Sequence, residues 1–390
     1  MKRRAPATLA VVLAAAACGA RTPLFGDDES NEGIISIADT LVDGAPPGDG
    51  AAAGDGAILG DGAARDGAVG DATLRDASTV DARTTDGSAV DASVIDAGAV
   101  EILATGQLVP NDIAVDGTTV YWVNVGQSAA TGSVVKMAKS GPGMGSVLTL
   151  AGARDYPGTI AVDATQVYWT EGSGPTIGGV FAVSRGGGSV TTLAQSASAK
   201  SVAVDATYVY WVTVHGQIPG AGTVMRVSRT GGAATTLVTG ETSPVGLALD
   251  NARAYWVGGN QAGVVKTLRK TDSSVMTLLA NEAEPYQIAV AQNRLVFINQ
   301  GDGTVRTVRT DGTGETVRAS GLQRPYDVAA DAVNAYVTDN YGGTVVKVPL
   351  LGGSATTIAA GLAGPSGIAI DATHVYWTEA GSGTIKRAPK

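Results

Sequence analysis

The chain has 390 residues, of which 16% are charged and 54 are glycine. So much glycine disfavours a helical bundle, because glycine destabilises a helix interior by about 1 kcal/mol relative to alanine. The single cysteine and two histidines exclude a disulfide framework, a multi-cysteine zinc or iron–sulfur site and a histidine-rich metal site.

The formal net charge of −9 is unevenly distributed along the chain. Residues 1–26 contain four basic and no acidic residues, whereas residues 27–98 contain 14 Asp and 2 Glu against 3 Arg. Residues 99–390 contain 20 acidic and 20 basic residues. The acidity therefore belongs to residues 27–98, and the rest of the chain has no basic excess that would attract nucleic acid.

The N-terminus has the pattern of an export signal. Residues 2–4 (KRR) are cationic, and residues 7–17 (ATLAVVLAAAA) form an apolar run. This run of 11 residues is too short for a helix that spans a bilayer, which needs about 20, but it fits the core of a secretory signal. Cys18, the only cysteine, follows it directly.

The segment resembles a bacterial lipoprotein signal, in which cleavage leaves a lipidated cysteine as the new first residue. The resemblance implies lipidation of Cys18, although Ala15 stands where the family motif has Leu, and Gly19 implies sorting to the outer membrane. We therefore expect residues 1–18 to be a lipoprotein signal and the exported protein to be lipid-anchored in the cell envelope. The alternative is an ordinary cleaved signal with an incidental cysteine.

Residues 19–98 are predicted to be a disordered acidic linker rich in Gly, Ala and Asp. An aspartate recurs every five residues from Asp61 to Asp96. This period fits neither a helix nor a strand, so no continuous apolar face forms, and like charges keep the segment extended. A calcium-binding repeat is the alternative, but calcium loops need several oxygen ligands that converge within one turn, and even spacing does not provide them.

Residues 99–390 contain an internal repeat. Its IAVD element recurs with spacings of 47, 42, 45, 41, 40 and 40 residues, which is the range of four-stranded propeller blades. The aspartate position of this element is occupied by Asp116, Asp163, Asp205, Asp250, Ala291, Asp331 and Asp371. Each unit contains four short runs rich in Val, Ile, Thr, Tyr and Trp, separated by Gly, Asp, Asn and Ser turns, which are typical of strands.

The two ends of the repeat predict how the ring closes. The last unit stops after its third strand, at residues 385–387, and residues 100–104 (VEILA) form an orphan fourth strand at the start. Pairing these two segments completes the last blade and removes an exposed sheet edge. We therefore predict an all-β fold, a seven-bladed β-propeller with 1+3 strand closure, over residues 99–390.

Two repeated residue sets are interpreted as structural. All five tryptophans occupy one repeat position, which indicates packing between neighbouring sheets rather than a carbohydrate-stacking platform. The repeated aspartates precede turns and are expected to accept hydrogen bonds from turn backbone. These two sets are Trp122, Trp169, Trp211, Trp256 and Trp377, and the six aspartates given above.

The repeat resembles the YWTD and NHL classes of β-propeller, with VYWTE at 167–171 and 375–379 nearest to the YWTD element. The resemblance covers nearly all of residues 99–390 and implies the fold rather than a function. Receptor propellers of the YWTD class have six blades and an Asp after the Thr. Here seven units are present, and Glu171 and Glu379 replace that Asp.

In folds of this kind the start of the first strand and the end of the second strand share the face around the central channel, and loops on a rigid scaffold carry function. The residues at these positions differ from blade to blade, which favours a binding role. The candidate ligand-binding residues are Asp112, Tyr286, Gln287, Tyr326 and Asp327 near the first strands, and Glu171, Asn299, Asp339 and Glu379 at the ends of second strands.

The sequence favours a binding module, expected to be a monomer, that presents this channel-mouth face to an unknown protein, peptide or glycan. No catalytic residues and no required cofactor are predicted. A purely structural role, such as docking to an envelope complex, predicts the same sequence features as a binding module.

The alternative is a divalent-metal-dependent enzyme. The resemblance to gluconolactonase-type propellers implies that Asp112, Asp327, Asn299, Glu171 and Asp339 would ligate calcium or magnesium. A lyase that also uses histidines is disfavoured, because His215 and His374 lie in different blades.

Overall fold

A computed structural model of the chain describes residues 100–172, 178–215, 218–259 and 262–390. The predicted signal segment at 1–18, with Cys18, and the predicted linker at 19–98 lie outside these residues. Among the described residues, no helix is long and apolar enough to cross a membrane.

The described residues form 28 strands in seven four-stranded antiparallel sheets. Blade 1 contains β2 (Pro110–Val115), β3 (Thr119–Asn124), β4 (Gly132–Ala138) and β5 (Leu148–Arg154). Blade 2 contains β6 (Pro157–Val162), β7 (Gln166–Gly172), β8 (Gly178–Ser184) and β9 (Thr191–Gln195). Blade 3 contains β10 (Ala199–Val204), β11 (Tyr208–Thr213), β12 (Gly222–Ser228) and β13 (Thr235–Glu241).

The remaining blades follow in the same order. Blade 4 contains β14 (Pro244–Leu249), β15 (Arg253–Gly258), β16 (Gly263–Arg269) and β17 (Val275–Glu282). Blade 5 contains β18 (Pro285–Ala291), β19 (Arg294–Asn299), β20 (Thr304–Arg309) and β21 (Thr316–Ala319). Blade 6 contains β22 (Pro325–Ala330), β23 (Asn334–Asp339), β24 (Thr344–Pro349) and β25 (Thr356–Ala359). Blade 7 contains β26 (Pro365–Ile370), β27 (His374–Glu379), β28 (Thr384–Pro389) and β1 (Glu101–Ala104).

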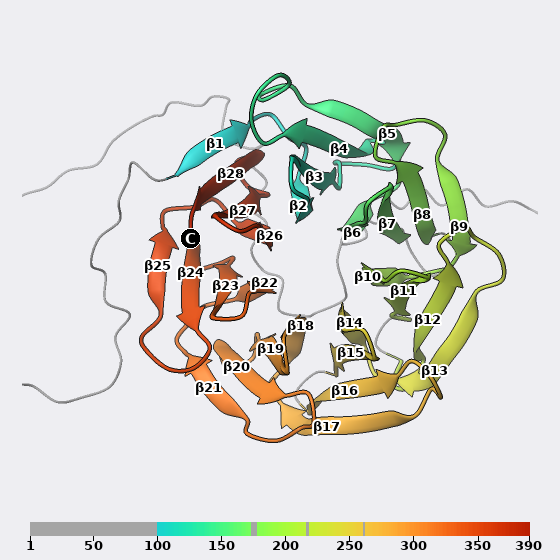
Figure 1. Cartoon of the computed structure of the whole chain (residues 1–390), viewed down its shortest axis with the longest axis vertical. Helices are drawn as coiled ribbons and strands as arrows, with labels where there is room; N and C mark the ends of the chain where they lie inside the picture. Colours follow the sequence, from blue (N-terminus) through green and yellow to red (C-terminus); the bar gives the residue numbers. More distant parts are fainter. Residues whose placement is uncertain (1–99, 173–177, 216–217, 260–261) are drawn as a thin grey trace, which may run out of the picture. The chain divides into compact units, whose positions relative to one another are not determined.

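The blades form a closed ring around a central axis (Figure 1). The first strand of each blade is innermost, and each inner strand packs against the inner strands of both neighbouring blades, including β26 of blade 7 against β2 of blade 1. In the last blade the strand order is β1-β28-β27-β26. The all-β, seven-bladed prediction and its 1+3 strand closure are therefore confirmed.

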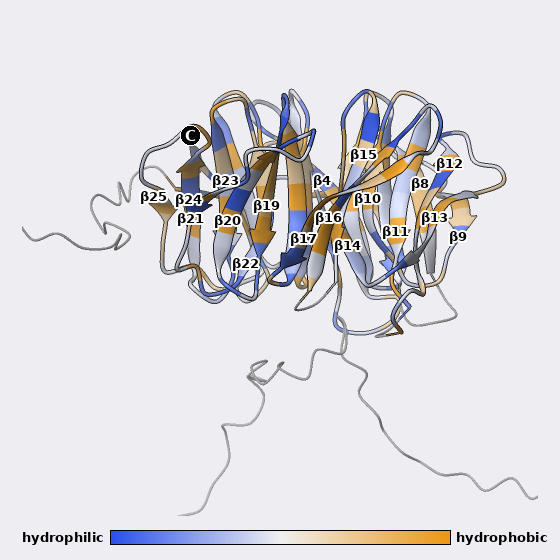
Figure 2. Cartoon of the chain, turned by 90° about the horizontal axis from the view of Figure 1, so that it is seen from below, coloured by the Kyte–Doolittle hydropathy of each residue, from blue (hydrophilic) through white to orange (hydrophobic). Residues whose placement is uncertain are grey.

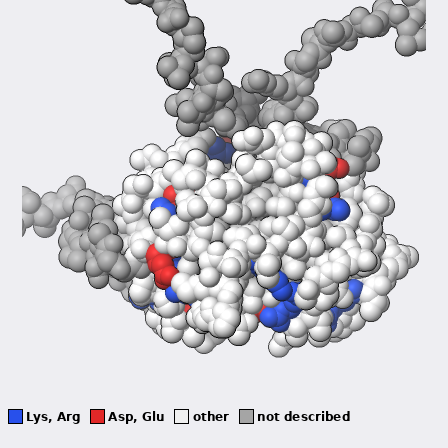
Figure 3. Space-filling view, turned by 90° about the horizontal axis from the view of Figure 1, so that it is seen from above, with Lys and Arg blue, Asp and Glu red and all other residues white. Residues whose placement is uncertain are grey.

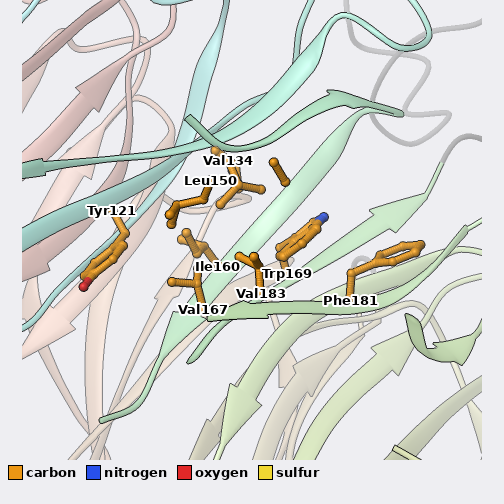
Figure 4. Packing of buried hydrophobic residues seen from close by; sticks show 10 residues of the cluster. Tyr121, Val134, Leu150, Ile160, Val167, Trp169, Phe181 and Val183 are labelled. Carbon is orange, nitrogen blue, oxygen red and sulfur yellow. The ribbon is translucent and has the colours of Figure 1, made fainter. Parts of the chain in front are cut away.

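The hydrophobic core lies between adjacent blades rather than inside one sheet. Successive residues of a strand point to opposite faces, so each second strand supplies apolar side chains to both neighbours. In blade 1, Tyr121 packs toward Trp169 of blade 2, whereas Trp122 packs toward Tyr376 of blade 7. Figure 4 shows the first of these clusters, and Figure 2 shows the hydrophobic bands along the strands.

The tryptophans are fully buried, as the packing interpretation predicts. Each of the five has a relative exposure of 0%, and each indole N–H donates to a side-chain oxygen. A buried indole N–H needs such an acceptor, because leaving it unpaired would cost its desolvation. Blade 5 has Phe297 at this position and needs no acceptor there.

The six repeated aspartates hold turns, as predicted, and five of them also form ion pairs with the next blade. In blade 1, Asp116 Oδ1 accepts hydrogen bonds from the backbone N–H groups of Thr118 and Thr119, at 2.8 and 2.9 Å. Its Oδ2 accepts from the hydroxyl of Tyr121 at 2.9 Å and from the guanidinium of Arg185 in blade 2. We call each such pair of an aspartate and a base from the next blade an inter-blade latch. The latches are Asp116–Arg185, Asp163–Arg229, Asp205–Lys270, Asp331–Lys390 and Asp371–Lys139.

One interface replaces the latch with an apolar contact. Blade 5 has Ala291 in place of the aspartate, and blade 6 has Leu350 in place of the base. Both residues are buried in one hydrophobic cluster. The substitution of both partners keeps the interface free of an unpaired charge, which would be costly to bury.

Candidate functional site

The seven inner strands begin at one end of the ring, and we call the first three residues of each inner strand the mouth. In every blade the pairing between the first and second strands shifts directly after the first mouth residue. Such bulges redirect side chains from the regular alternation of a strand. The second and third mouth residues are thereby placed toward the neighbouring inner strands.

Third mouth residues join adjacent inner strands by hydrogen bonds. Asp112 Oδ2 accepts from the backbone N–H of Ile160 in blade 2 at 2.8 Å, and Asp327 Oδ2 accepts from that of Ile368 in blade 7 at 2.9 Å. Thr159 and Ser201 hydroxyls make the same bond to the next blade. Two predicted ligand-binding residues, Asp112 and Asp327, therefore also hold the ring together.

Glycine occupies this position where the neighbouring strand comes too close for a side chain. A Cβ added at Gly367 would lie 2.6 Å from the carbonyl oxygen of Asn111 in blade 1. A Cβ at Gly246 would lie 2.9 Å from Cα of Gln287, another predicted site residue. Part of the variation among blades at this position therefore reflects the spacing of inner strands and not ligand specificity.

The two mouth carboxyls influence each other. Burial raises the pKa of Asp112 to about 6, although two backbone N–H groups favour its ionised form. Burial also raises the pKa of Asp327 well above its usual range, and the charge of Asp112 raises it further. Like charges in a poorly solvated site disfavour simultaneous ionisation, so the negative charge at the mouth falls as the pH drops toward 6.

Second mouth residues meet one another across the inner ring. The Tyr326 hydroxyl of blade 6 donates to Asn111 Oδ1 of blade 1 at 3.1 Å, and the Asn111 amide donates to the carbonyl of Gly158 in blade 2 at 2.8 Å. The rings of Tyr286 and Tyr326 have centroids 5.3 Å apart at an interplanar angle of 48°. Burial raises the pKa of Tyr326 and lowers that of Lys200 in blade 3.

The set of second mouth residues was only partly anticipated from the sequence. Tyr286 and Tyr326 were predicted, whereas Asn111 and Lys200 were not. Their position in the repeat could have identified them. Each directly follows the first residue of an inner strand, and that first residue is proline in six of the seven blades. The complete set is Asn111, Gly158, Lys200, Val245, Tyr286, Tyr326 and Ser366.

The four predicted residues at the ends of second strands are buried and already paired. Glu171 accepts from the Trp169 indole and from Arg154, both at 2.6 Å. Glu379 accepts from Trp377 at 3.2 Å and pairs with Lys386 at 2.7 Å. The glutamate of the VYWTE element thus supplies the acceptor that its buried tryptophan requires.

The other two also have partners, although the buried Oδ1 of Asn299 has none among the described residues. Asp339 accepts from the backbone N–H groups of Gln323 and Arg324 at 3.0 and 2.8 Å, and Asn299 donates to Glu282 at 2.8 Å. The relative exposure of Glu171, Asn299, Asp339 and Glu379 is between 0% and 5%. Each of the four lies directly opposite the first mouth residue of its blade, but all four are buried, whereas the five predicted residues of the first strands are only partly buried.

The residues of the mouth do not fit a calcium or magnesium site. Within the described part of the chain, no group of three His, Cys, Asp or Glu residues could hold a metal ion. Both oxygens of Asp112 and both of Asp327 accept backbone hydrogen bonds. The two histidines are also apart, because His374 begins β27 at the end opposite the mouth, whereas His215 follows the end of β11.

Comparisons with known proteins establish the fold alone. No protein-family model matches the sequence, and no curated protein sequence is similar to it. A catalytically inactive histidine-to-alanine variant of virginiamycin B lyase from Staphylococcus aureus, solved with quinupristin, has a TM-score of 0.60 and 15% identity. The likeness covers 75% of this chain and 99% of the lyase.

Two further solved structures are similar over most of this chain. The computationally designed Ika8 protein has a TM-score of 0.55 and 15% identity, over 74% of this chain and 99% of Ika8. Puromycin hydrolase has the same TM-score and identity, over 70% of this chain and 50% of the hydrolase. A lyase, a hydrolase and a designed protein share this architecture, so the fold does not select a function. What the likenesses establish is a seven-bladed β-propeller.

Proposed function

We propose that this protein is an exported, lipid-anchored binding module that recognises a protein, peptide or glycan through the mouth of its propeller. The observation that carries the proposal is the contrast between the mouth and the rest of the repeat. Positions that hold blades together carry the same residue types in most blades, whereas the second mouth residues are Asn, Gly, Lys, Val, Tyr, Tyr and Ser. Variable side chains on a rigid scaffold are the usual means of specific recognition.

The chemistry of the mouth supports the proposal. Tyr286 and Tyr326 supply a paired aromatic surface on one side of the mouth, and Lys200 adds a cationic side chain in blade 3. Tyrosine is favoured at binding surfaces because it offers a large apolar face together with a hydroxyl. The alternative of a metal-dependent lactonase or lyase has less support, because the four carboxylates among the predicted ligands already accept hydrogen bonds from other groups.

Binding can be tested with variants that copy residues from other blades. Tyr286→Val takes the residue of blade 4 at the same position, and Tyr326→Ser takes that of blade 7, so the double variant is expected to fold. The full chain would be tested against glycan and peptide arrays, with His374→Asn at the opposite end as a matched control. The proposal predicts saturable binding that the double variant loses and the control keeps. Equal binding by both variants would place recognition elsewhere.

Anchoring has a separate test. Expression of the full chain in a bacterial host, with Cys18→Ser beside it, should place the wild type in the membrane fraction and label it with radioactive palmitate. The variant should lose the label and leave that fraction. A Cys18→Ser protein that stays membrane-bound would favour a different mode of attachment.

A further inference from the structure

Blade 5 departs from the repeat at a position where the other six blades agree. In every blade the outermost strand has a bulge in its pairing with the third strand. The residue at the bulge is Leu or Ile in six blades and packs against the inter-blade core. These residues are Leu103, Leu150, Leu193, Leu237, Leu278 and Ile358, and in blade 5 the residue is Arg318.

Arg318 is half-buried on β21, and its only hydrogen bond among the described residues goes from Nε to the hydroxyl of Thr307, at 2.9 Å. Thr307 on β20 has a relative exposure of 0%. In the register of β19 and β20, Thr307 lies opposite Val296, which packs against blade 6. The Arg318 guanidinium therefore lies on the face of blade 5 that is directed toward blade 6.

Two further arginines lie on the same face. Arg294 and Arg309 are directly opposite each other across β19 and β20, two residues along from the pair of Val296 and Thr307. Since side chains alternate between faces, all four side chains share one side of the sheet. Like charges directly opposite are unfavourable in a sheet. Burial and the charge of Arg294 together lower the pKa of Arg318.

The repeat supplies an internal comparison for this pair of positions. Blade 4 also has two arginines here, but Arg269 is paired with Asp272 at 3.0 Å and the bulge residue is Leu278. The other five blades carry uncharged pairs or His–Pro, namely Thr119–Ala138, Gln166–Ser184, Tyr208–Ser228, Asn334–Pro349 and His374–Pro389. Three arginines together thus occur in blade 5 alone among the described blades.

Among the described residues, these arginines also have no acidic partner at ion-pair distance. Within the described part of the chain, none of Arg294, Arg309 and Arg318 forms an ion pair, whereas the latch bases all do. The neighbouring Asp311 is exposed, and its pKa is lowered first by hydrogen bonds from Thr313 and, to a smaller extent, by the charge of Arg309. On the side of the ring seen in Figure 3, Lys and Arg side chains lie in several small groups, some of them beside Asp or Glu. A local departure from the repeat that costs stability without a compensating contact indicates a functional site.

We propose that Arg294, Arg309 and Arg318 form a binding site for a phosphate group on the face of blade 5 directed toward blade 6. Guanidinium groups present several N–H donors in a fixed geometry that suits the oxygens of a phosphate, and charge-assisted hydrogen bonds are the strong ones. The exposed Asp311 offsets at most one of the three positive charges, and a dianionic phosphate would neutralise the other two. The site is separate from the mouth, because Arg294 and Arg309 lie at the opposite end of their strands.

The test uses the full chain and variants that give blade 5 the residues of blade 2. These changes are Arg294→Gln, Arg309→Ser and Arg318→Leu. Isothermal titration calorimetry would measure binding of two probes, inorganic phosphate and soluble dihexanoyl phosphatidic acid. The first probe reports on a free phosphate, and the second reports on the phosphate of a lipid headgroup. The matched control is the double variant Arg253→Gln and Arg269→Ser, which removes two charges from blade 4.

We expect at least one probe to bind saturably to the wild type and about tenfold or more weakly to the triple variant, since the variant loses its charge-assisted hydrogen bonds to the phosphate. The control should bind as the wild type does. Arg318→Leu alone restores the repeat residue, so it should fold and still weaken binding. The proposal is overturned if neither probe binds saturably, if the triple variant binds like the wild type, or if the control loses as much affinity.

Discussion

The latch between blade 7 and blade 1 allows a quantitative prediction. Lys139 Nζ lies 2.6 Å from Asp371 Oδ2 and 4.7 Å from the ring centroid of Tyr376. The Lys139 side chain has a relative exposure of 7%. Asp371→Asn keeps an oxygen that can accept from the turn backbone but removes the charge that neutralises this lysine.

Breaking a buried ion pair from one side costs about 3–5 kcal/mol, because the remaining charge is left buried. The contact with Tyr376 keeps part of the lysine stabilised, so we expect about 3 kcal/mol for Asp371→Asn. A change of that size lowers the Tm of a large domain by roughly 6–12 °C. Differential scanning calorimetry of the wild type and the variant measures this shift.

A second substitution distinguishes loss of charge pairing from damage to the turn. Blade 6 has Leu350 where blade 1 has Lys139, so Lys139→Leu copies a residue that the fold already accepts. Added to Asp371→Asn, it removes the buried unpaired charge and should recover at least half of the lost stability. If the loss of unfolding free energy in the double variant equals the sum of the losses in the two single variants, Lys139 and Asp371 do not stabilise each other, and the prediction is refuted.

Three further predictions concern pH and packing. Although burial opposes it, the hydrogen bond from Lys390 lowers the pKa of Asp331 to about 2. Its stabilisation is therefore present above the unfolded pKa of about 3.9 and lost as the pH falls toward 2, so the Tm of Asp331→Asn should depend less on pH in that window. Burial raises the pKa of Asp112 to about 6. Between these pKa values the folded chain keeps a proton on Asp112 that the unfolded chain has lost. The contribution of Asp112 to the free energy of unfolding should therefore decrease as the pH rises from about 4 to 6, and this decrease should be smaller in Asp112→Thr. Finally, Gly367→Ala places a methyl 2.6 Å from the carbonyl oxygen of Asn111. Guanidinium chloride denaturation should show that the free energy of unfolding decreases by about 1–3 kcal/mol. An unchanged denaturation midpoint would mean that the inner strands can move apart without loss of stability.

The repeat explains why so much of the fold could be predicted. Short strands with a fixed spacing, an incomplete last unit and an orphan strand at residues 100–104 determine a closed ring of seven blades with the first strand completing the last. The structural roles of Trp122 and Asp116, and of their equivalents, followed from the same logic. A residue type that recurs once per blade is required by the contact between blades.

The candidate site was predicted less completely, and the reason lies in partners that are distant in sequence. Glu171 and Asp339 vary among blades, yet both are buried, because Glu171 meets Arg154 at the end of blade 1 and Asp339 meets the backbone N–H of Arg324 directly before blade 6. Asp112 varies as well, but its partner is the backbone of blade 2, 48 residues along the chain. Variation alone does not separate a ligand contact from a locally matched hydrogen bond.

The architecture follows from the linear repeat, which specifies strand number, order and closure. The folded ring was needed to show which variable residues meet at the mouth and that Arg294, Arg309 and Arg318 share one face of blade 5. The physical reason is that register, bulges and side-chain alternation set which side chains face each other across strands and blades. A linear pattern records the position of each residue in its own strand, but it does not contain the identity of its neighbour in the next blade.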